Sequence, residues 1–218
     1  MSAADPATEA RRAHALARIF DGSETPTAYA AAYIEHMNDV LRAVDTDAVA
    51  QAVEAIERCA TDDKTFFVMG NGGSGAVAAH WVNDLGANTV VPGKPGFRAI
   101  SLSDNASAIT AIANDASYEE IFSIQLAAAM RPGDVVMALS VSGNSPNIVR
   151  GIDYANEHGA FTIGCSGMKG GALLQRAKLS IHVASTADEY GPVEDIFSVV
   201  MHIIQTCIAM RRGRYLAH

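Results

Sequence analysis

The stretch GNGGSG at residues 70–75 places four glycines within six residues, directly after an apolar run at residues 65–69. Glycine has no Cβ, so a loop of this composition adopts positive φ angles readily and lets a ligand come close to the backbone. If the loop ends a strand and begins a helix, the unpaired N–H groups and the helix dipole favour an anion. The stretch therefore predicts an anion-binding loop, with a simple tight turn as the alternative.

The same six residues do not make a convincing dinucleotide-binding fingerprint. They fit the GxGxxG spacing, but that motif needs an acidic residue about twenty positions later, at the end of a second strand. No such residue is present there. A phosphate or a sugar therefore suits this loop better than a dinucleotide.

A second loop, LSVSGNSPN at residues 139–147, carries three serine hydroxyls just before a predicted helix. The helix is expected to begin near Pro146, because proline is favoured in the first turn. Ser140, Ser142 and Ser145 would then lie beside the unpaired N–H groups of the helix start, which can bind phosphate without a cation. Capping of the helix by Ser145 is the alternative, but it leaves the other two hydroxyls unexplained.

Two pairs of residues have spacings that suit a shared metal ion. His80 and Asp84 are four apart on a predicted helix and therefore share one face. Glu194 and His202 are eight apart on the predicted last helix, which rotates them by only about 80°. Imidazole and carboxylate ligands suit zinc or another divalent transition metal. The alternatives are a surface hydrogen bond between His80 and Asp84, and a His202 satisfied within the core.

The elements that would hold these residues alternate along the chain after a helical start. The first sixty residues predict helices at 8–21, 27–43 and 46–60, and a last helix is expected from Pro192 to about Arg211. Short runs that are apolar on both faces and alternate with helices predict a parallel sheet. The fold class is therefore α/β: a doubly wound five-stranded parallel sheet flanked by helices, with an N-terminal helical extension. The predicted strands lie at residues 65–69, 97–102, 134–139, 161–165 and 179–183.

The amino-acid composition limits the cellular compartments and the classes of partner that suit this protein. The 218 residues carry a formal net charge of −8 without a cluster of lysine and arginine, which disfavours nucleic acid as a partner. No stretch approaches the roughly 18 uninterrupted apolar residues of a membrane span, and the start lacks the features of a secretory signal. A cytoplasmic protein without a membrane partner is expected. The cysteines, Cys59, Cys165 and Cys207, are far apart in apolar surroundings and are expected to be buried thiols.

Taken together, strand, GNGGS, helix, strand, SxSGNS and helix resemble the SIS (sugar isomerase) phosphosugar-binding domain. With AIANDASYEEIF at 111–122 and RPGDVVMALSVSGNSPN at 131–147, the pattern is similar to the phosphoheptose isomerases. The resemblance implies an oligomerisation extension at residues 1–60 and a SIS domain at 61–218. It also implies interconversion of sedoheptulose 7-phosphate and D-glycero-D-manno-heptose 7-phosphate, by a homotetramer. The implied sugar-binding residues are Asn71, Gly72, Gly73, Ser74, Asn114 and Asp115, and the implied phosphate-binding residues are Ser140, Val141, Ser142 and Ser145.

The resemblance also implies that His80, Asp84, Glu194 and His202 hold one metal ion, most simply Zn²⁺. This sequence departs from the family at two of these positions, where Asp84 replaces glutamate and Glu194 replaces glutamine. An aldose–ketose isomerase needs a base that moves a proton between C2 and C1, a polarised carbonyl and a shuttle for the hydroxyl proton. Asp84 or Glu194 is the expected base, and His202 the expected partner acid/base.

Two other functions fit the same motifs. One is a non-catalytic SIS protein, either a phosphosugar sensor or a tetramer that binds protein, like the paralogues that associate with the replication initiator. Retention of all four potential ligands weighs against it. The other is an isomerase of a related ketose phosphate in a capsule or secondary-metabolite pathway, which the departures at Asp84 and Glu194 keep open.

Overall fold

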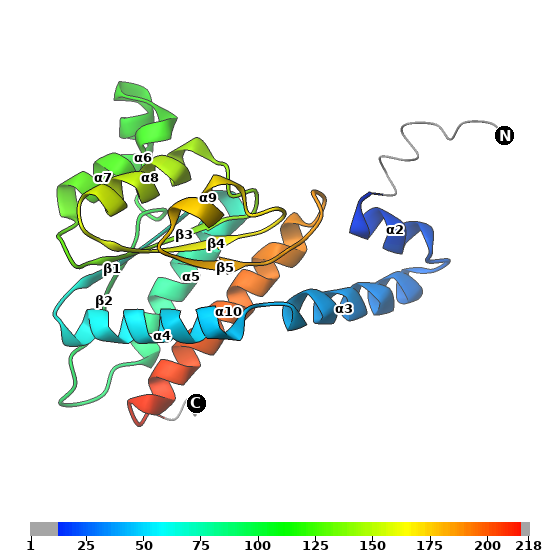
Figure 1. Cartoon of the computed structure of the whole chain (residues 1–218), viewed down its shortest axis with the longest axis horizontal. Helices are drawn as coiled ribbons and strands as arrows, with labels where there is room; N and C mark the ends of the chain where they lie inside the picture. Colours follow the sequence, from blue (N-terminus) through cyan, green and yellow to red (C-terminus); the bar gives the residue numbers. More distant parts are fainter. Residues whose placement is uncertain (1–12, 215–218) are drawn as a thin grey trace.

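The computed structural model describes residues 13–214, and a five-stranded parallel sheet forms its centre (Figure 1). The strand order is β2-β1-β3-β4-β5, and every pair of neighbours runs parallel. Each predicted strand agrees with an observed one to within a residue at either end, so the α/β prediction is confirmed. The strands are β1 (Thr65–Gly70), β2 (Arg98–Ser101), β3 (Val135–Ser140), β4 (Phe161–Ser166) and β5 (Leu179–His182).

Helices cover both faces of the sheet, as expected for a doubly wound fold (Figure 1). On β1, Phe66 and Val68 pack with α4, α5 and α10, whereas Phe67 and Met69 pack with α7 and α8 on the other face. This alternation explains why the strand is apolar throughout. The helices are α2 (Ala15–Asp21), α3 (Pro26–Arg42), α4 (Thr46–Thr61), α5 (Gly72–Asn88), α6 (Ala106–Asp115), α7 (Ser123–Ala129), α8 (Pro146–Glu157), α9 (Gly171–Arg176) and α10 (Tyr190–Arg211), with a 3₁₀ turn η1 (Tyr118–Glu120).

The register of β1 and β3 positions the two predicted ligand loops. Gly70, the last residue of β1, pairs with Leu139 near the end of β3. Because parallel strands end at the same edge of a sheet, the glycine loop and the serine loop emerge side by side. Helices α5 and α8 begin directly after these loops, at Gly72 and Pro146.

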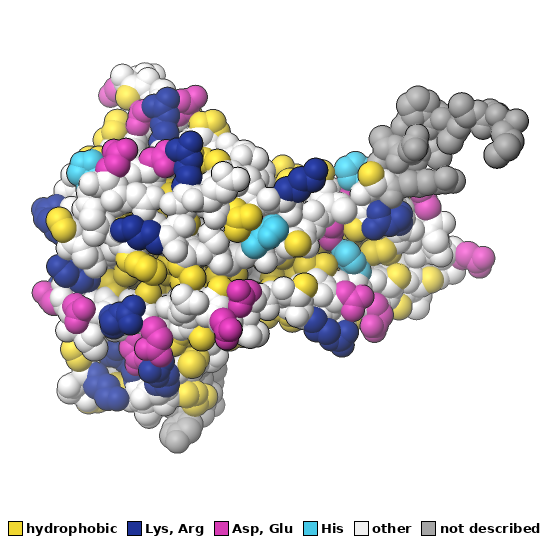
Figure 2. Space-filling view, viewed as in Figure 1, with side chains coloured by type: hydrophobic (Ala, Val, Ile, Leu, Met, Phe, Trp, Pro, Cys, Tyr) yellow, Lys and Arg dark blue, Asp and Glu magenta, His cyan; other side chains and the backbone are white. Residues whose placement is uncertain are grey.

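The N-terminal helices differ in how they pack. Helix α4 buries eight residues, most of them in the core that it shares with α5 and α10. Helices α2 and α3 project from this body, and α3 buries only Val40 within the chain (Figure 1). Figure 2 shows hydrophobic side chains on the surface of this arm, where Phe20 is 62% exposed and Ile34 is 59% exposed. Part of the helix predicted at 8–21 lies outside the described residues, and the domain boundary after residue 60 stays a prediction.

Helix α10 is, among the described residues, the one helix long and apolar enough to cross a membrane. Half of its most apolar window is buried inside this chain, where it packs against α5 and α4. Val193, Ile196, Phe197, Val200 and Ile204 each lie almost wholly within the core. The helix is therefore a core helix of the fold.

The cysteines follow the expectation in two of three cases. Cys59 and Cys165 are buried, and burial raises the pKa of each thiol to about 12. Cys207, in contrast, is exposed, so the prediction was wrong for this residue. It lies on the outer face of α10, where it borders an apolar groove formed with α3 and α4.

Candidate functional site

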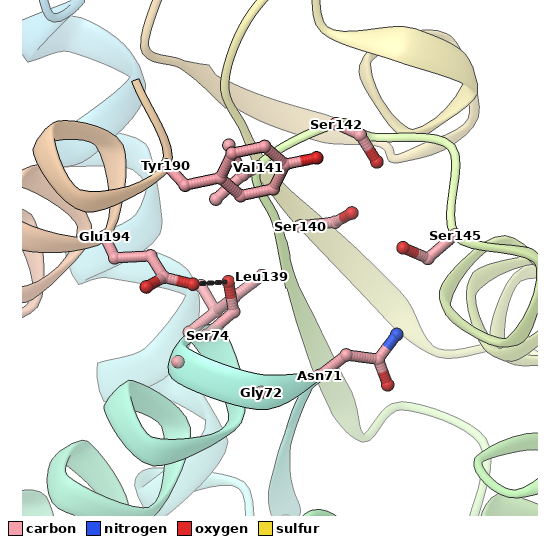
Figure 3. Close-up of a pocket in the computed structure, with 11 residues that line it drawn as sticks. Asn71, Gly72, Ser74, Leu139, Ser140, Val141, Ser142, Ser145, Tyr190 and Glu194 are labelled. Atoms are coloured by element: carbon pink, nitrogen blue, oxygen red, sulfur yellow. Dashed lines mark hydrogen bonds between the residues drawn. The ribbon is translucent and has the colours of Figure 1, made fainter. Parts of the chain in front are cut away.

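A cavity of about 250 Å³ opens where the glycine loop meets the serine loop. Figure 3 shows the two loops facing each other across it, with Tyr190 and Glu194 entering from α10. The cavity thus combines the carboxyl ends of two strands with the starts of two helices, which is where doubly wound folds bind ligands. Its lining residues are Asn71, Gly72, Gly73, Ser74, Leu139, Ser140, Val141, Ser142, Ser145, Tyr190 and Glu194.

The glycines of the first loop are needed for different physical reasons. A Cβ at Gly70 would lie 2.6 Å from the backbone of Ser74, and one at Gly75 would lie 2.9 Å from the carbonyl oxygen of Gly70. These two residues are therefore required by the tight turn from β1 into α5. Gly72 has a φ of +53°, which favours glycine. A Cβ at Gly73 would collide with the carboxylate of Glu194, so this glycine leaves room for a charged group at the cavity wall.

Glu194 reaches the cavity from the first turns of α10. One oxygen of its carboxylate accepts a hydrogen bond of 3.1 Å from the hydroxyl of Ser74, as Figure 3 shows. Tyr190, one turn earlier on the same helix, also lines the cavity and was missed by the sequence reading. The reason is that α10 begins at Tyr190, two residues before the predicted start at Pro192. The i,i+4 spacing of Tyr190 and Glu194 was the available signal.

The serine loop presents hydroxyls that are only partly used by the protein. The Ser140 hydroxyl accepts a hydrogen bond of 3.2 Å from the N–H of Gly143, and the Ser142 hydroxyl accepts one of 3.2 Å from the N–H of Asn144. Ser145 occupies the N-cap position of α8, but its side chain makes no capping hydrogen bond. Capping therefore does not explain the hydroxyl of Ser145, which faces the cavity (Figure 3).

The electrostatics of the cavity suit one anion near the serine loop. Among the described residues that line it there is no lysine or arginine. Favourable potential comes instead from the starts of α5 and α8, whose first N–H groups have no acceptor within the helix. Arg150 forms ion pairs with Glu119 and Glu120 and does not line this cavity. Lys169 borders a separate cavity next to α9.

Three of the four predicted metal ligands lie together on α5 and α10. The Nε2 atom of His80 is 3.3 Å from Oδ2 of Asp84, and Nε2 of His202 is 3.6 Å from the same oxygen. One ligand atom from each residue lies within 4.8 Å of the others. The two imidazole rings meet edge to face with centroids 5.2 Å apart. Two imidazoles and one carboxylate form a donor set that zinc accepts, so these residues fit a divalent metal.

Glu194 is not part of this group. Helices α5 and α10 run in the same direction, because Ser74 contacts Glu194 near their starts while Asp84 and His202 meet further along. Eight residues of helix separate Glu194 from His202, a rise of about 12 Å. The structure therefore divides the predicted residues between a cavity that contains Glu194 and a neighbouring group of three.

Two predicted sugar contacts lie outside the cavity. Asn114 and Asp115 are exposed at the end of α6, where the amide of Asn114 donates a hydrogen bond of 2.7 Å to the Asp115 carboxylate. Neither lines the cavity, so their role stays a prediction. Trp81, next to His80, packs edge to face on Phe66 of β1 and is 2% exposed, as a core residue should be.

The comparisons of sequence and of structure with known proteins agree with one another. The family model for the SIS domain matches residues 32–167. The chain is 40% identical over 151 residues to the probable phosphoheptose isomerase of Thermoplasma acidophilum, covering 69% of this chain and 81% of that protein. It is 35% identical over 170 residues to the phosphoheptose isomerase of Trichlorobacter lovleyi, covering 78% and 84%. The solved phosphoheptose isomerase of Neisseria gonorrhoeae matches with a TM-score of 0.76 at 25% identity, covering 85% of this chain and 100% of that one.

Proposed function

The chain belongs to the SIS domain family and, within it, to the phosphoheptose isomerases, and we propose that it interconverts sedoheptulose 7-phosphate and D-glycero-D-manno-heptose 7-phosphate. One observation carries this proposal: a single cavity is lined by the serine loop, by the glycine loop and by Glu194, whose carboxylate accepts a hydrogen bond from Ser74. A phosphate at the serine loop and a base at Glu194 would then lie on opposite sides of the same cavity.

The serine loop is the proposed phosphate site. Ser140, Ser142 and Ser145 donate hydrogen bonds to the phosphate oxygens, together with the backbone N–H of Val141, and the dipole of α8 adds favourable potential. The glycine loop, with Asn71, Gly72, Gly73 and Ser74, holds the sugar hydroxyls. Asn114 and Asp115 do not line the cavity, and their proposed contact with the sugar rests on the family resemblance alone.

Glu194 is the proposed base that moves the proton between C1 and C2. Its carboxylate lies at the cavity wall, where it accepts a hydrogen bond from Ser74 that fixes its direction. Asp84, in contrast, lies between His80 and His202 and is better placed to hold a metal. This assignment chooses between the two carboxylates that the sequence left open, and it places His202 with the metal-holding residues.

His80, Asp84 and His202 would hold Zn²⁺ or another divalent transition metal. When bound, such an ion supplies Lewis-acid polarisation of a carbonyl oxygen. The C1–C2 end of the sugar would have to lie between Glu194 and this group, because the base and the metal act on adjacent atoms of the substrate. Glu194 would complete the ligand set only by turning its side chain along α10, so we propose that it acts from the cavity.

Gly73→Ala tests the contact between the glycine loop and the base. The added methyl group would displace the Glu194 carboxylate, and a misplacement of about 1 Å can cost about a hundredfold in rate. We expect kcat/KM for sedoheptulose 7-phosphate to fall between tenfold and a hundredfold, by these magnitudes. The matched control is Gly86→Ala in the same helix, where a Cβ meets nothing within 4 Å. This control should leave the rate unchanged, and equal rates for both variants would contradict the assignment.

An assay across ketose phosphates with five to seven carbons, on protein whose metal content is measured by elemental analysis, tests the function. We expect a bound divalent metal and the highest kcat/KM with sedoheptulose 7-phosphate. A higher value with a shorter ketose phosphate would indicate the related isomerase. Binding without turnover of any of them would indicate a phosphosugar-binding protein.

We further propose a cytoplasmic homotetramer. The arm formed by α2 and α3 exposes Phe20 and Ile34, and α10 exposes Ile203 and Met210, which gives apolar surface to cover. An apolar groove of about 380 Å³ between α3, α4 and α10 adds to it. Light scattering at micromolar concentration should give four times the chain mass, and a single-chain mass would contradict the assembly.

A further inference from the structure

The side chains of Asn71 and Asn147 form a reciprocal pair that connects the glycine loop to the start of α8. The Nδ2 of Asn71 donates to Oδ1 of Asn147 at 2.9 Å, and the Nδ2 of Asn147 donates to Oδ1 of Asn71 at 2.8 Å. Asn147 is 1% exposed and does not line the cavity, and its Oδ1 also accepts from the N–H of Ile148. Its amide orientation is therefore fixed from both sides.

The pair determines which hydrogen-bonding group of Asn71 remains free to contact a ligand. A side-chain amide has two donor N–H groups and an oxygen that accepts two hydrogen bonds. The oxygen of Asn71 accepts from Asn147 and also from the hydroxyl of Tyr118 at 3.2 Å. One N–H is used by Asn147. Within the described residues the second N–H has no acceptor, and Asn71 lines the cavity, as Figure 3 shows.

We propose that Asn147 is a positioning residue, which holds Asn71 so that it offers one N–H donor and no acceptor to the sugar. Asn71 then recognises an acceptor oxygen of the ligand, and a fixed donor of this kind is most effective towards an oxygen that gains negative charge during proton transfer. The same pair fixes the spacing of the glycine loop relative to the serine loop. The proposal rests on the proposed function in that the ligand is a sugar phosphate.

A double-mutant cycle tests whether Asn147 acts through Asn71. Asn147→Ala should lower kcat/KM for sedoheptulose 7-phosphate by about tenfold to a hundredfold, because the donor is no longer held in place. In the Asn71→Ala background, Asn147→Ala should change kcat/KM by less than about twofold, since the group that it positions is already absent. If the fold losses in kcat/KM of the two single variants multiply in the double variant, the proposal is overturned.

Asn147→Asp gives a second readout that keeps the shape of the side chain. When ionised, the introduced carboxylate can accept from Asn71 but cannot donate to its oxygen, whereas the protonated carboxyl group restores the donor. The ratio of kcat/KM for this variant to that of the unchanged protein should therefore rise as pH falls towards the carboxyl pKa. A ratio that does not vary with pH would count against positioning by this hydrogen bond.

Asn156→Ala is the matched control on the same helix. The side chain of Asn156 donates to the carbonyl of Arg176 and accepts from Thr162, away from the cavity. We expect Asn156→Ala to lower thermal stability but to leave kcat/KM unchanged. If Asn156→Ala lowered kcat/KM as much as Asn147→Ala does, Asn147 would have only a stabilising role.

A ligand-free measurement separates failure of this inference from failure of the proposed function. Hydrogen exchange of the Asn71 side-chain amide should show one protected and one unprotected proton, and Asn147→Ala should remove the protection. This result stands whether or not the protein turns over the heptose phosphate. Two unprotected protons in the unchanged protein would overturn the pairing.

Discussion

Replacement of Asp84 by asparagine should abolish stable metal binding and lower kcat by at least about a hundredfold. Asp84 supplies the one carboxylate of the described group, and both histidines point their Nε2 atoms at the same oxygen. An amide keeps the shape of the side chain but loses the negative charge that offsets a divalent cation. Loss of an outer-shell partner alone costs about tenfold to a hundredfold, so loss of a ligand should cost at least the upper value. Elemental analysis and the isomerase assay measure the two effects separately.

A surface aspartate provides the control for Asp84. Asp153 forms an ion pair with Arg176 on the outside of α8 and α9, and Asp153→Asn removes the same charge. This control should keep both the metal and the activity, because exposed ion pairs contribute little. If Asp84→Asn loses activity but retains a full equivalent of metal, Asp84 is the base rather than a ligand, and the division of roles proposed above is wrong.

Replacement of Glu194 by glutamine should lower kcat by about a hundredfold to ten thousandfold, the range expected when a general base is removed. The substitution keeps the length of the side chain and its contact with Ser74. Metal content should not change, because Glu194 lies at the cavity and outside the His80, Asp84 and His202 group.

An unchanged kcat in the Glu194→Gln variant would contradict the role of Glu194 as the base. If Glu194→Gln keeps full activity, glutamine performs the same task, and that task is not proton abstraction. Asp195→Asn is the control on the neighbouring position of the same helix, since Asp195 is exposed and does not line the cavity. It should leave kcat and metal content unchanged.

The sheet and the two ligand loops could be predicted because each depends on local sequence. The central strands β1, β3 and β4 are buried on both faces, and the short edge strands β2 and β5 are partly exposed, yet the limits of all five were clear to within a residue. The loops follow directly from strands whose order brings Gly70 beside Leu139. The serine hydroxyls therefore reached the same cavity as the glycine loop, as the motif indicated.

What could not be predicted depends on side-chain direction and on helix packing. Glu194 and His202 share a helix face approximately, but Glu194 turns to Ser74 whereas His202 turns to Asp84. Sequence periodicity predicts the helix face on which a side chain lies, but it does not predict whether that side chain points towards the start or the end of the helix. Asn147 looks like an ordinary residue of a helix start, and its role depends on a partner 76 residues away. The places of Asn114 and Asp115 depend on how α6 packs, which local pattern does not determine.

Proton transfer in heavy water tests the central claim most directly. The protein is incubated with sedoheptulose 7-phosphate and a divalent metal in deuterium oxide, and the sugar phosphates are followed by NMR. We expect the seven-carbon aldose phosphate to carry deuterium at C2, because the base removes a proton from C1 of the ketose, exchanges it with the solvent and delivers a deuteron to C2. Binding of the ketose phosphate without conversion, or an aldose formed without any deuterium at C2, would contradict proton abstraction by a group in this cavity.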